Sequence, residues 1–265
     1  MSPEHTDAAR LARAAGHLLL RIRSGSDRFV DRAELGREAD RRSNELLSHR
    51  LATLYPGDAI LSEESAEDGR RFDCGRVWIV DPLDGTREFT EPGRNDWAVH
   101  VALVAGGLPV AAAVALPAQR LVMSTAARPA VPARSNGHLR MVVSRSRPPA
   151  IAAAVADAID AELVPMGSAG AKAMAVVRGE VDVYLHDGGQ YEWDSAAPAG
   201  VAAAAGLHCS RLDGTPLMYN NPSPWSPEIL ICRPELADTI LRIVEQVRAD
   251  DDDDQLELQK GTLQT

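Results

Sequence analysis

Apolar side chains near the N-terminus recur at helical spacing in two stretches. The first follows Thr6, which can cap a helix, and stops before Gly25; its apolar positions are Leu11, Ala15, Leu18 and Ile22. The second runs from about residue 38 to residue 54 and stops at Pro56-Gly57; its apolar stripe is Leu46, Leu47, Leu51 and Leu54. The pattern predicts two amphipathic helices.

Short apolar runs then replace the helical pattern and predict strands. These runs cover residues 59–62, 77–80, 97–105, 109–116 and 121–125. Gly106-Gly107 separates two of them and predicts a hairpin. Residues 126–137 are rich in Pro, Ala and turn formers, which is typical of an exposed loop.

From Leu139 onward, strand-like and helix-like patterns alternate. The strand-like runs are 139–144, 162–166 and 181–185, and the helical stretches start near 149, 169 and 195. Residues 231–234 lead into a last helix that is predicted to end near Arg248. Alternation of this kind favours an α/β arrangement after a more antiparallel first part.

Three segments follow from these patterns. Residues 1–138 are predicted to form an α+β half and residues 139–248 an α/β half. Residues 249–265 begin with the acidic run Asp250 to Asp254 and show no apolar periodicity, which predicts a disordered, solvated tail, with a regulatory tail as the alternative.

The charge balance argues against nucleic acid as a partner. The chain has 28 Lys and Arg against 38 Asp and Glu, a formal net charge of -10. A nucleic-acid surface needs clustered cations. A small phosphorylated molecule needs only a local cation, a metal or backbone N–H groups, so a small-molecule partner stays open.

Cysteine usage and the N-terminus indicate a cytoplasmic protein. Cys74, Cys209 and Cys232 lie far apart and form no CxxC pair, which disfavours a zinc site or a disulfide framework. The N-terminus is charged and polar, unlike a signal peptide. No uncharged apolar run reaches the roughly 18 residues that a membrane span requires.

Two carboxylates follow a buried-looking strand in VWIVDPLDGTREF, residues 77–89. Asp81 and Asp84 flank Pro82, which fixes its φ and helps to turn the chain. Two carboxylates in one small volume repel each other unless a proton or a cation neutralises them. Mg²⁺ prefers oxygen ligands, and the carbonyl of Leu83 is a further candidate.

Two more acidic stretches are candidates to converge on the same place. One is Ser62-Glu63-Glu64-Ser65 and the other is Glu192-Trp193-Asp194-Ser195. Each has a plainer interpretation, because Asp194 can cap a helix and the two glutamates can be surface charges. A second LDGT at 212–215 lacks a preceding apolar strand, and its Asp-Gly predicts a turn.

The ordered set ILSEES, WIVDPLDGTREF and EWDSAAP resembles the magnesium-dependent inositol monophosphatase superfamily. Members of that superfamily show EE, then DP(I/L)DGT, then WDxAA. The resemblance covers about residues 7–248 and implies their fold, a layered α/β/α/β/α sandwich. It also implies two to three Mg²⁺ ions per site, held by Glu63, Asp81, the carbonyl of Leu83, Asp84 and Asp194, with Asp81 bridging two ions.

Catalytic roles follow from the same resemblance. Thr86 is expected to orient the attacking water, and its hydroxyl to bond to Asp40 from an upstream (T/S)xAD motif. Here that motif reads Arg37-Glu38-Ala39-Asp40, with Arg in the place of Thr. Glu63 takes part in the chemistry as a ligand. Gly85 and Thr86 are expected to open a helix whose N–H groups face the phosphate.

Three further stretches resemble bisphosphate nucleotidases of the CysQ type. Arg87-Glu88-Phe89 is similar to their Lys-Glu-Phe, and Val143 to Ser146 to the start of their Ser-Arg-Ser-His, with Arg147 in place of His. Residues 167–172, GSAGAK, resemble their glycine-rich segment ending in lysine. The candidate substrate-binding residues are Gly85, Thr86, Arg87, Ser144, Arg145, Gly167, Ser168 and Lys172. Their plainer interpretations are a surface charge, a helix cap and a loop entering a helix.

The resemblance implies a Mg²⁺-dependent phosphatase that converts 3'-phosphoadenosine 5'-phosphate to AMP and phosphate in sulfate assimilation. Inositol 1-phosphate and fructose 1,6-bisphosphate are the alternative substrates, and lithium inhibition and a homodimer are expected. A non-catalytic protein that senses the nucleotide is the alternative class of function. It is disfavoured because every carboxylate expected as a metal ligand is present. His100, on an apolar strand, is predicted to be a core or surface residue, and Tyr184 and Tyr191 are candidates to flank the base.

Overall fold

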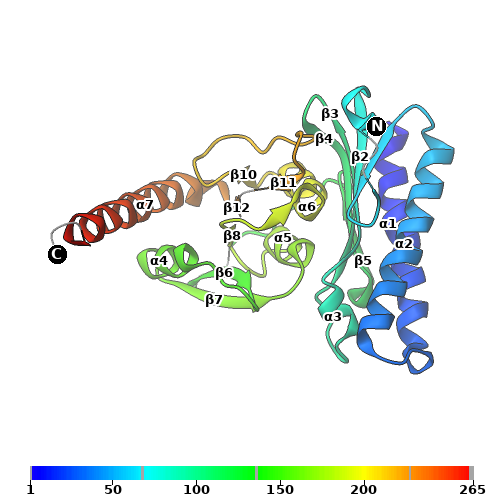
Figure 1. Ribbon diagram of the computed structural model, residues 1–265, viewed down its shortest axis with the longest axis horizontal. Coiled ribbons are helices and arrows are strands. Elements are labelled where there is room, and N and C mark those ends of the chain that lie inside the picture. Colours follow the sequence, from blue (N-terminus) through cyan, green and yellow to red (C-terminus); the bar gives the residue numbers. More distant parts are fainter. Residues whose placement is uncertain (1, 67–68, 135–136, 227, 263–265) are drawn as a thin grey trace.

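Two five-stranded sheets and three layers of helices build the protein (Figure 1). The computed structural model describes residues 2–66, 69–134, 137–226 and 228–262, with the backbone alone for 251–262. Helices α1 and α2 cover one face of the first sheet, α5 and α6 lie between the sheets, and α4 and α7 cover the far face of the second. The α/β/α/β/α sandwich is therefore confirmed.

The first two helices start earlier than their apolar stripes indicate. Helix α1 spans Pro3–Ser24 and α2 spans Arg32–Leu54. Proline in the first turn gives up no hydrogen bond, so α1 begins before Thr6. Asp31 caps α2 by accepting a hydrogen bond from the Glu34 N–H at 2.8 Å.

The first sheet has the order β1-β2-β3-β4-β5. Its strands are β1 Ala59–Ser62, β2 Arg76–Asp84, β3 Ala98–Ala105, β4 Leu108–Leu116 and β5 Leu121–Ser124. Strand β1 runs parallel to β2 and the other pairs are antiparallel. Gly106-Gly107 joins β3 to β4, so the predicted hairpin is confirmed.

The second sheet has the order β10-β12-β8-β6-β7. Its strands are β6 Leu139–Ser144, β7 Ala161–Met166, β8 Val183–His186, β10 His208–Ser210 and β12 Ile229–Cys232. Strands β6, β7 and β8 are mutually parallel, so their carboxyl ends share one edge. A small antiparallel pair, β9 Gln190–Tyr191 and β11 Trp225–Ser226, stands apart.

The remaining helices are α3 Thr86–Thr90, α4 Ala150–Ala158, α5 Ala169–Val177, α6 Glu192–Ala204 and α7 Pro234–Thr262. Helix α7 ends at Thr262 and continues through the acidic run. This corrects the prediction of a helix that ends near Arg248 and of a disordered tail from residue 249. Extending an existing helix costs far less than nucleating one, and the first interrupting glycine is Gly261. No helix in the described ranges is long and apolar enough to cross a membrane.

Alternation along the central strands divides the core between two layers. Trp78 and Val80 of β2 pack with the apolar faces of α1 and α2, whereas Val77 and Ile79 pack on the side of α6. These helices bury most of the apolar run at 97–116, although Leu108 and Val110 stay exposed. That run therefore has partners within its own chain, and the homodimer stays a prediction.

Helix α6 approaches β4 closely because both are rich in small residues. A Cβ built on Gly200 would lie 2.9 Å from Ala112 Cβ and 2.9 Å from Pro109 Cβ. Gly200→Val is therefore expected to overpack this contact and lower the free energy of unfolding by about 1–3 kcal/mol. Urea denaturation measures the change.

Ala203→Val is the matched control for this prediction. Ala203 lies on the exposed side of the same helix, so valine there meets mainly the helix-propensity cost of roughly 0.5 kcal/mol. Equal losses for the two variants would contradict close packing of α6 on β4.

Candidate metal and phosphate site

Strand β2 delivers two carboxylates because its pairing with β3 slips near its end. Asp81 is opposite His100 and Asp84 is opposite Ala98, with the register shift between them. The Asp81 Oδ1 accepts a hydrogen bond from the Leu83 N–H at 3.0 Å, and the Ser43 hydroxyl donates to the Pro82 carbonyl at 2.7 Å. The turn is thus fixed by hydrogen bonds that leave other carboxylate oxygens available.

Helix α6 brings a third carboxylate to the same place. Asp81, Asp84 and Asp194 each offer an oxygen, and these oxygens lie within 4.8 Å of one another. The Asp194 Oδ2 also accepts a hydrogen bond from the Tyr191 N–H at 2.7 Å, so this residue caps the helix start as well. The capping interpretation and the ligand interpretation are therefore compatible, because a carboxylate has two oxygens and each can accept more than one contact.

Glu63 follows β1, whose end lies beside β2. Ser62 pairs with Val80, so the next residue of β1 comes near Asp81. Glu63 stands at the solvent-facing rim and outside the group of three aspartates. The surrounding protein, and then the charges on Asp194 and Glu64, raise the pKa of Glu63 to about 7. The charge on Glu63, a predicted ligand, therefore interacts with the charges of the aspartate cluster.

Crowding of like charges dominates the electrostatics of the three aspartates. Burial, followed by the charges of Asp84 and Glu63, raises the pKa of Asp81. Burial and the charge of Asp84 raise the pKa of Asp194 to about 6. Burial would also raise the pKa of Asp84, but His100 and Lys172 outweigh it and lower that pKa to about 2.

Thr86 and Asp40 meet as the motif resemblance implied. The Thr86 hydroxyl lies 3.3 Å from Asp40 Oδ2 and 3.3 Å from the Leu83 carbonyl oxygen. Burial and the charge of Glu64 raise the pKa of Asp40 to about 8. The Asp40 Oδ1 is buried and has no hydrogen-bond partner in the described part of the chain. Arg37, in place of the usual threonine, is exposed.

Gly85 supplies the sharp junction between β2 and α3. Its φ is 86°, in the region that favours glycine. A Cβ there would also lie 3.1 Å from Ser168 Cβ, so the second half of the chain approaches closely at this point. Helix α3 begins at Thr86 as predicted, but it has only 5 residues.

His100 is part of the site although the sequence analysis set it aside. It is fully buried, its Nε2 lies 3.1 Å from Asp84 Oδ2, and its Nδ1 lies 2.9 Å from the Trp193 carbonyl oxygen. A polar side chain in an apolar strand beside Asp81 was the signal that could have found it. The imidazole contacts a metal-ligand candidate rather than acting as one.

The segment GSAGAK contacts the first half of the chain. The Asp84 Oδ2 accepts hydrogen bonds from the Ser168 hydroxyl at 2.5 Å and from the Gly170 N–H at 2.7 Å. The Gly167 N–H donates to Asp96 Oδ2 at 2.7 Å. Each glycine is required by a close neighbour, because a Cβ at Gly167 would lie 2.3 Å from Glu88 Cδ and one at Gly170 2.1 Å from His100 Nε2.

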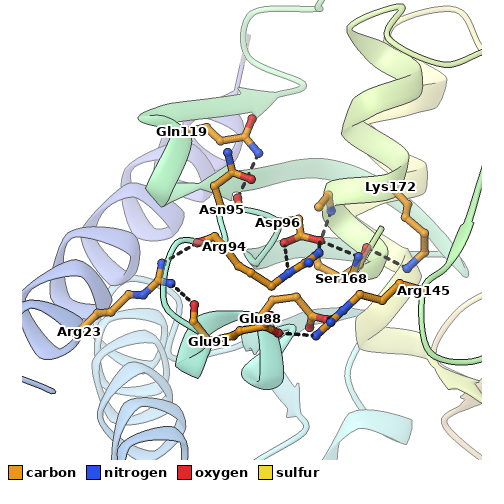
Figure 2. A network of polar contacts seen from close by, with 12 residues as sticks. Arg23, Glu88, Glu91, Arg94, Asn95, Asp96, Gln119, Arg145, Ser168 and Lys172 are labelled. Carbon is orange, nitrogen blue, oxygen red and sulfur yellow. Dashed lines mark hydrogen bonds and ion pairs between the residues drawn. The ribbon is translucent and has the colours of Figure 1, made fainter. Parts of the chain in front are cut away.

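Lys172 reaches back along α5 toward the start of that helix. Its ammonium donates to the Ser168 carbonyl at 2.9 Å (Figure 2). It also lies 5.3 Å from the centre of the Tyr184 ring. Burial lowers its pKa. The side chain is only 5% exposed, which places a cation inside the protein and close to the acidic cluster.

Arg145 pairs with carboxylates of the first half instead of standing free. Its Nε lies 2.6 Å from Glu88 Oε1 and its guanidinium lies 2.9 Å from Glu91 Oε2 (Figure 2). Arg94 pairs with Asp96 in the same network.

The two other candidate substrate residues lie nearby or on the surface. The Ser144 Oγ accepts a hydrogen bond from the Arg147 N–H at 3.3 Å, and Arg87 is exposed on α3. These observations agree with the plainer interpretations of a capped turn and a surface charge, and the substrate-binding roles of Ser144 and Arg87 stay predictions.

Comparison with known proteins agrees with this geometry. The profile of the inositol monophosphatase family matches residues 3–249. The 3'-phosphoadenosine 5'-phosphate phosphatase of Mycobacterium bovis is 52% identical over 235 residues, covering 86% of this chain and 88% of that protein. The 3'(2'),5'-bisphosphate nucleotidase CysQ of Escherichia coli K12 is 32% identical over 228 residues, covering 79% and 91%.

Solved structures give the same answer for the fold. CysQ from Bacteroides thetaiotaomicron superposes with a TM-score of 0.72 at 27% identity, covering 86% of this chain and 96% of that one. SuhB from Mycobacterium tuberculosis superposes with a TM-score of 0.70 at 25% identity, covering 91% and 95%. The chain belongs to the inositol monophosphatase family.

Proposed function

We propose that this protein is a Mg²⁺-dependent phosphatase that hydrolyses the 3'-phosphate of 3'-phosphoadenosine 5'-phosphate to give AMP and phosphate. The observation that carries the reaction class is the approach of Asp81, Asp84 and Asp194 to within 4.8 Å. The substrate rests on relatives at 52% and 32% identity that are named for this nucleotide or for bisphosphate nucleotides.

The donor set of the site fits a hard divalent cation. It consists of carboxylates and a carbonyl, with no thiolate and no imidazole among the candidate ligands Glu63, Asp81, Leu83, Asp84 and Asp194. Their raised pKa values express repulsion that a cation relieves. The unpartnered Oδ1 of Asp40 points to a further polar group, such as water, beside Thr86.

The roles of the chain's own residues follow from their contacts. When bound, the ions supply charge neutralisation at the phosphate and a lowered pKa for water. Thr86 orients the attacking water through its hydroxyl, whose partners are Asp40 and the Leu83 carbonyl. The Ser168 hydroxyl and the Gly170 N–H hold the Asp84 carboxylate in place through its Oδ2, and this carboxylate would help to hold a cation together with Asp81 and Asp194.

A substrate panel tests the proposal. We expect kcat/KM for 3'-phosphoadenosine 5'-phosphate to exceed that for inositol 1-phosphate and for fructose 1,6-bisphosphate, and EDTA to abolish turnover of all three. Preference for either alternative would reassign the substrate within the family. A protein that binds the nucleotide without Mg²⁺-dependent turnover would instead be a sensor.

The two LDGT tetrapeptides offer a matched pair of substitutions. Asp84→Asn is expected to lower kcat about 100-fold or more, because the amide can still accept from Ser168 and Gly170 while its NH₂ group replaces a ligand oxygen. Asp213→Asn should leave kcat unchanged, since Asp213 only accepts from Thr215 in an exposed turn. Equal effects of the two changes would remove Asp84 from the metal site.

Metal-free protein is expected to lose stability as the pH rises from 6.5 to 8. The pKa of Asp40 is raised to about 8 and that of Glu63 to about 7, so the folded state holds protons that the unfolded chain has already released. Stability that is present at low pH is then lost through this window. His100, whose pKa is raised, acts in the same direction, and His186, with a pKa lowered to about 4, acts oppositely only below pH 6.5.

Thermal unfolding in EDTA at half-unit pH steps measures this loss. Magnesium should raise the midpoint more at pH 8 than at pH 6.5, because binding requires ionised carboxylates. A midpoint that stays level or rises between these pH values in EDTA would contradict the raised pKa values.

A further inference from the structure

Ser168, between β7 and α5, has a backbone conformation that is unfavourable for residues other than glycine. Its φ is 48° and its ψ is 128°. Such conformations persist only where surrounding contacts impose them, and they are concentrated at functional sites. The Ser168 hydroxyl donates to Asp84 Oδ2 at 2.5 Å and accepts from the Ala171 N–H at 3.0 Å. The strained conformation therefore directs this hydroxyl at a predicted metal ligand.

A carboxylate from the first half of the chain holds the residue before Ser168. The Gly167 N–H donates to Asp96 Oδ2 at 2.7 Å, and Asp96 is only 6% exposed. A charged acceptor makes a stronger hydrogen bond than a neutral one. Because this bond fixes the backbone one residue before the strained position, it opposes relaxation of the turn that leads into α5.

Asp96 is itself held in place by contacts within the first half. Arg94 pairs with both of its carboxylate oxygens, with Nε 2.8 Å from Oδ1 (Figure 2). The Arg23 guanidinium of α1 donates to the Arg94 carbonyl at 2.8 Å, and the Gln119 amide donates to the Asn95 carbonyl at 3.1 Å. The turn that carries Asp96 is therefore a fixed support for the segment that it contacts.

Another buried aspartate shows what a purely structural contact of this kind looks like. Asp182 is 7% exposed and accepts from Arg233 Nε at 2.8 Å and from the Arg140 backbone N–H at 3.1 Å. Those donors connect it to the start of β6 and to the end of β12, not to a candidate metal ligand. Asp96 differs because the backbone that it holds continues directly into Ser168.

We infer that Asp96 is a positioning residue for the metal site. By holding the Gly167 N–H, it keeps the Ser168 hydroxyl on the carboxylate of Asp84. This inference rests on the proposed function for the presence of cations at Asp84. Hydrogen-bond partners of metal ligands orient those ligands, and loss of one typically costs about tenfold to a hundredfold in metal affinity or activity. Asp96 acts on the site only through the residues that it holds.

Binding of Mn²⁺ to the protein without substrate tests this role. Mn²⁺ takes the same carboxylate and carbonyl ligands as Mg²⁺, and the electron paramagnetic resonance signal of the free ion reports how much is bound. Asp96→Ala and Ser168→Ala should each weaken binding about tenfold or more. Because both changes break the same line of contacts, the double variant should bind no more weakly than the worse single variant, whereas independent losses would multiply to about a hundredfold.

Two further variants separate the positioning role from a structural one. Asp182→Ala, the matched control, should lower the thermal unfolding midpoint and leave Mn²⁺ binding unchanged. Asp96→Asn should restore most of the affinity, because its amide oxygen can still accept from Gly167. If Asp96→Ala fails to fold, Arg94→Met/Asp96→Ala replaces it in the series, since that pair of changes leaves no unpaired charge.

Phosphate release from adenosine 3',5'-bisphosphate separates failure of this role from failure of the proposed function. Unchanged Mn²⁺ binding in Asp96→Ala or in Ser168→Ala, or losses that multiply in the double variant, would overturn the positioning role. So would an Asp96→Asn variant that binds as weakly as Asp96→Ala, because the ion pair with Arg94 would then be the contact that matters. A wild type that binds Mn²⁺ through this arrangement yet releases no phosphate would overturn the phosphatase and leave the positioning role standing.

Discussion

Mutual repulsion of carboxylates is the constraint on which the rest of the site depends. The end of β2 and the start of α6 carry three carboxylates into a space where protein atoms exclude water, and the turn after β1 adds Glu63 at its rim. Such an arrangement is unfavourable on its own, because the charged forms are poorly solvated and repel each other. Packing and hydrogen bonds must therefore keep these groups close together. The hydrogen bonds come from three donors, each to one of the three aspartates: the Leu83 N–H, the Tyr191 N–H and the Ser168 hydroxyl.

Asp84 is where the two halves of the chain become one site. It belongs to the first sheet by sequence, yet its Oδ2 is bound by Ser168 and Gly170 from the start of α5. The Gly167 N–H reaches Asp96 in the same way, and Arg145 reaches Glu88 (Figure 2). A carboxylate held by two hydrogen bonds has little freedom to rotate, which keeps it beside Asp81 and Asp194.

Local patterns were sufficient for much of the fold, and motif order for much of the site. The helical stripes, the hairpin at Gly106-Gly107 and the strand before Asp81 are encoded within a few residues. His100 was missed because its role depends on the register between β2 and β3, which places it opposite Asp81. The predicted end of α7, near Arg248, was wrong because charge composition says little about how far a helix propagates. The division of the chain at residue 138 stays a prediction.

Close approach at Gly167, which precedes α5, and at Gly170, within α5, ties positions together that are far apart in the sequence. The hydrogen of Gly170 faces the His100 imidazole, and that of Gly167 faces the Glu88 carboxylate, with no room for a methyl group at either place. Alanine at position 170 would require the buried His100 ring to move, and alanine at position 167 would require the Glu88 side chain to move. The contact at Gly170 leaves less freedom, because His100 is fully buried and its two ring nitrogens contact Asp84 and the Trp193 carbonyl, so the identities of residues 100 and 170 depend on each other.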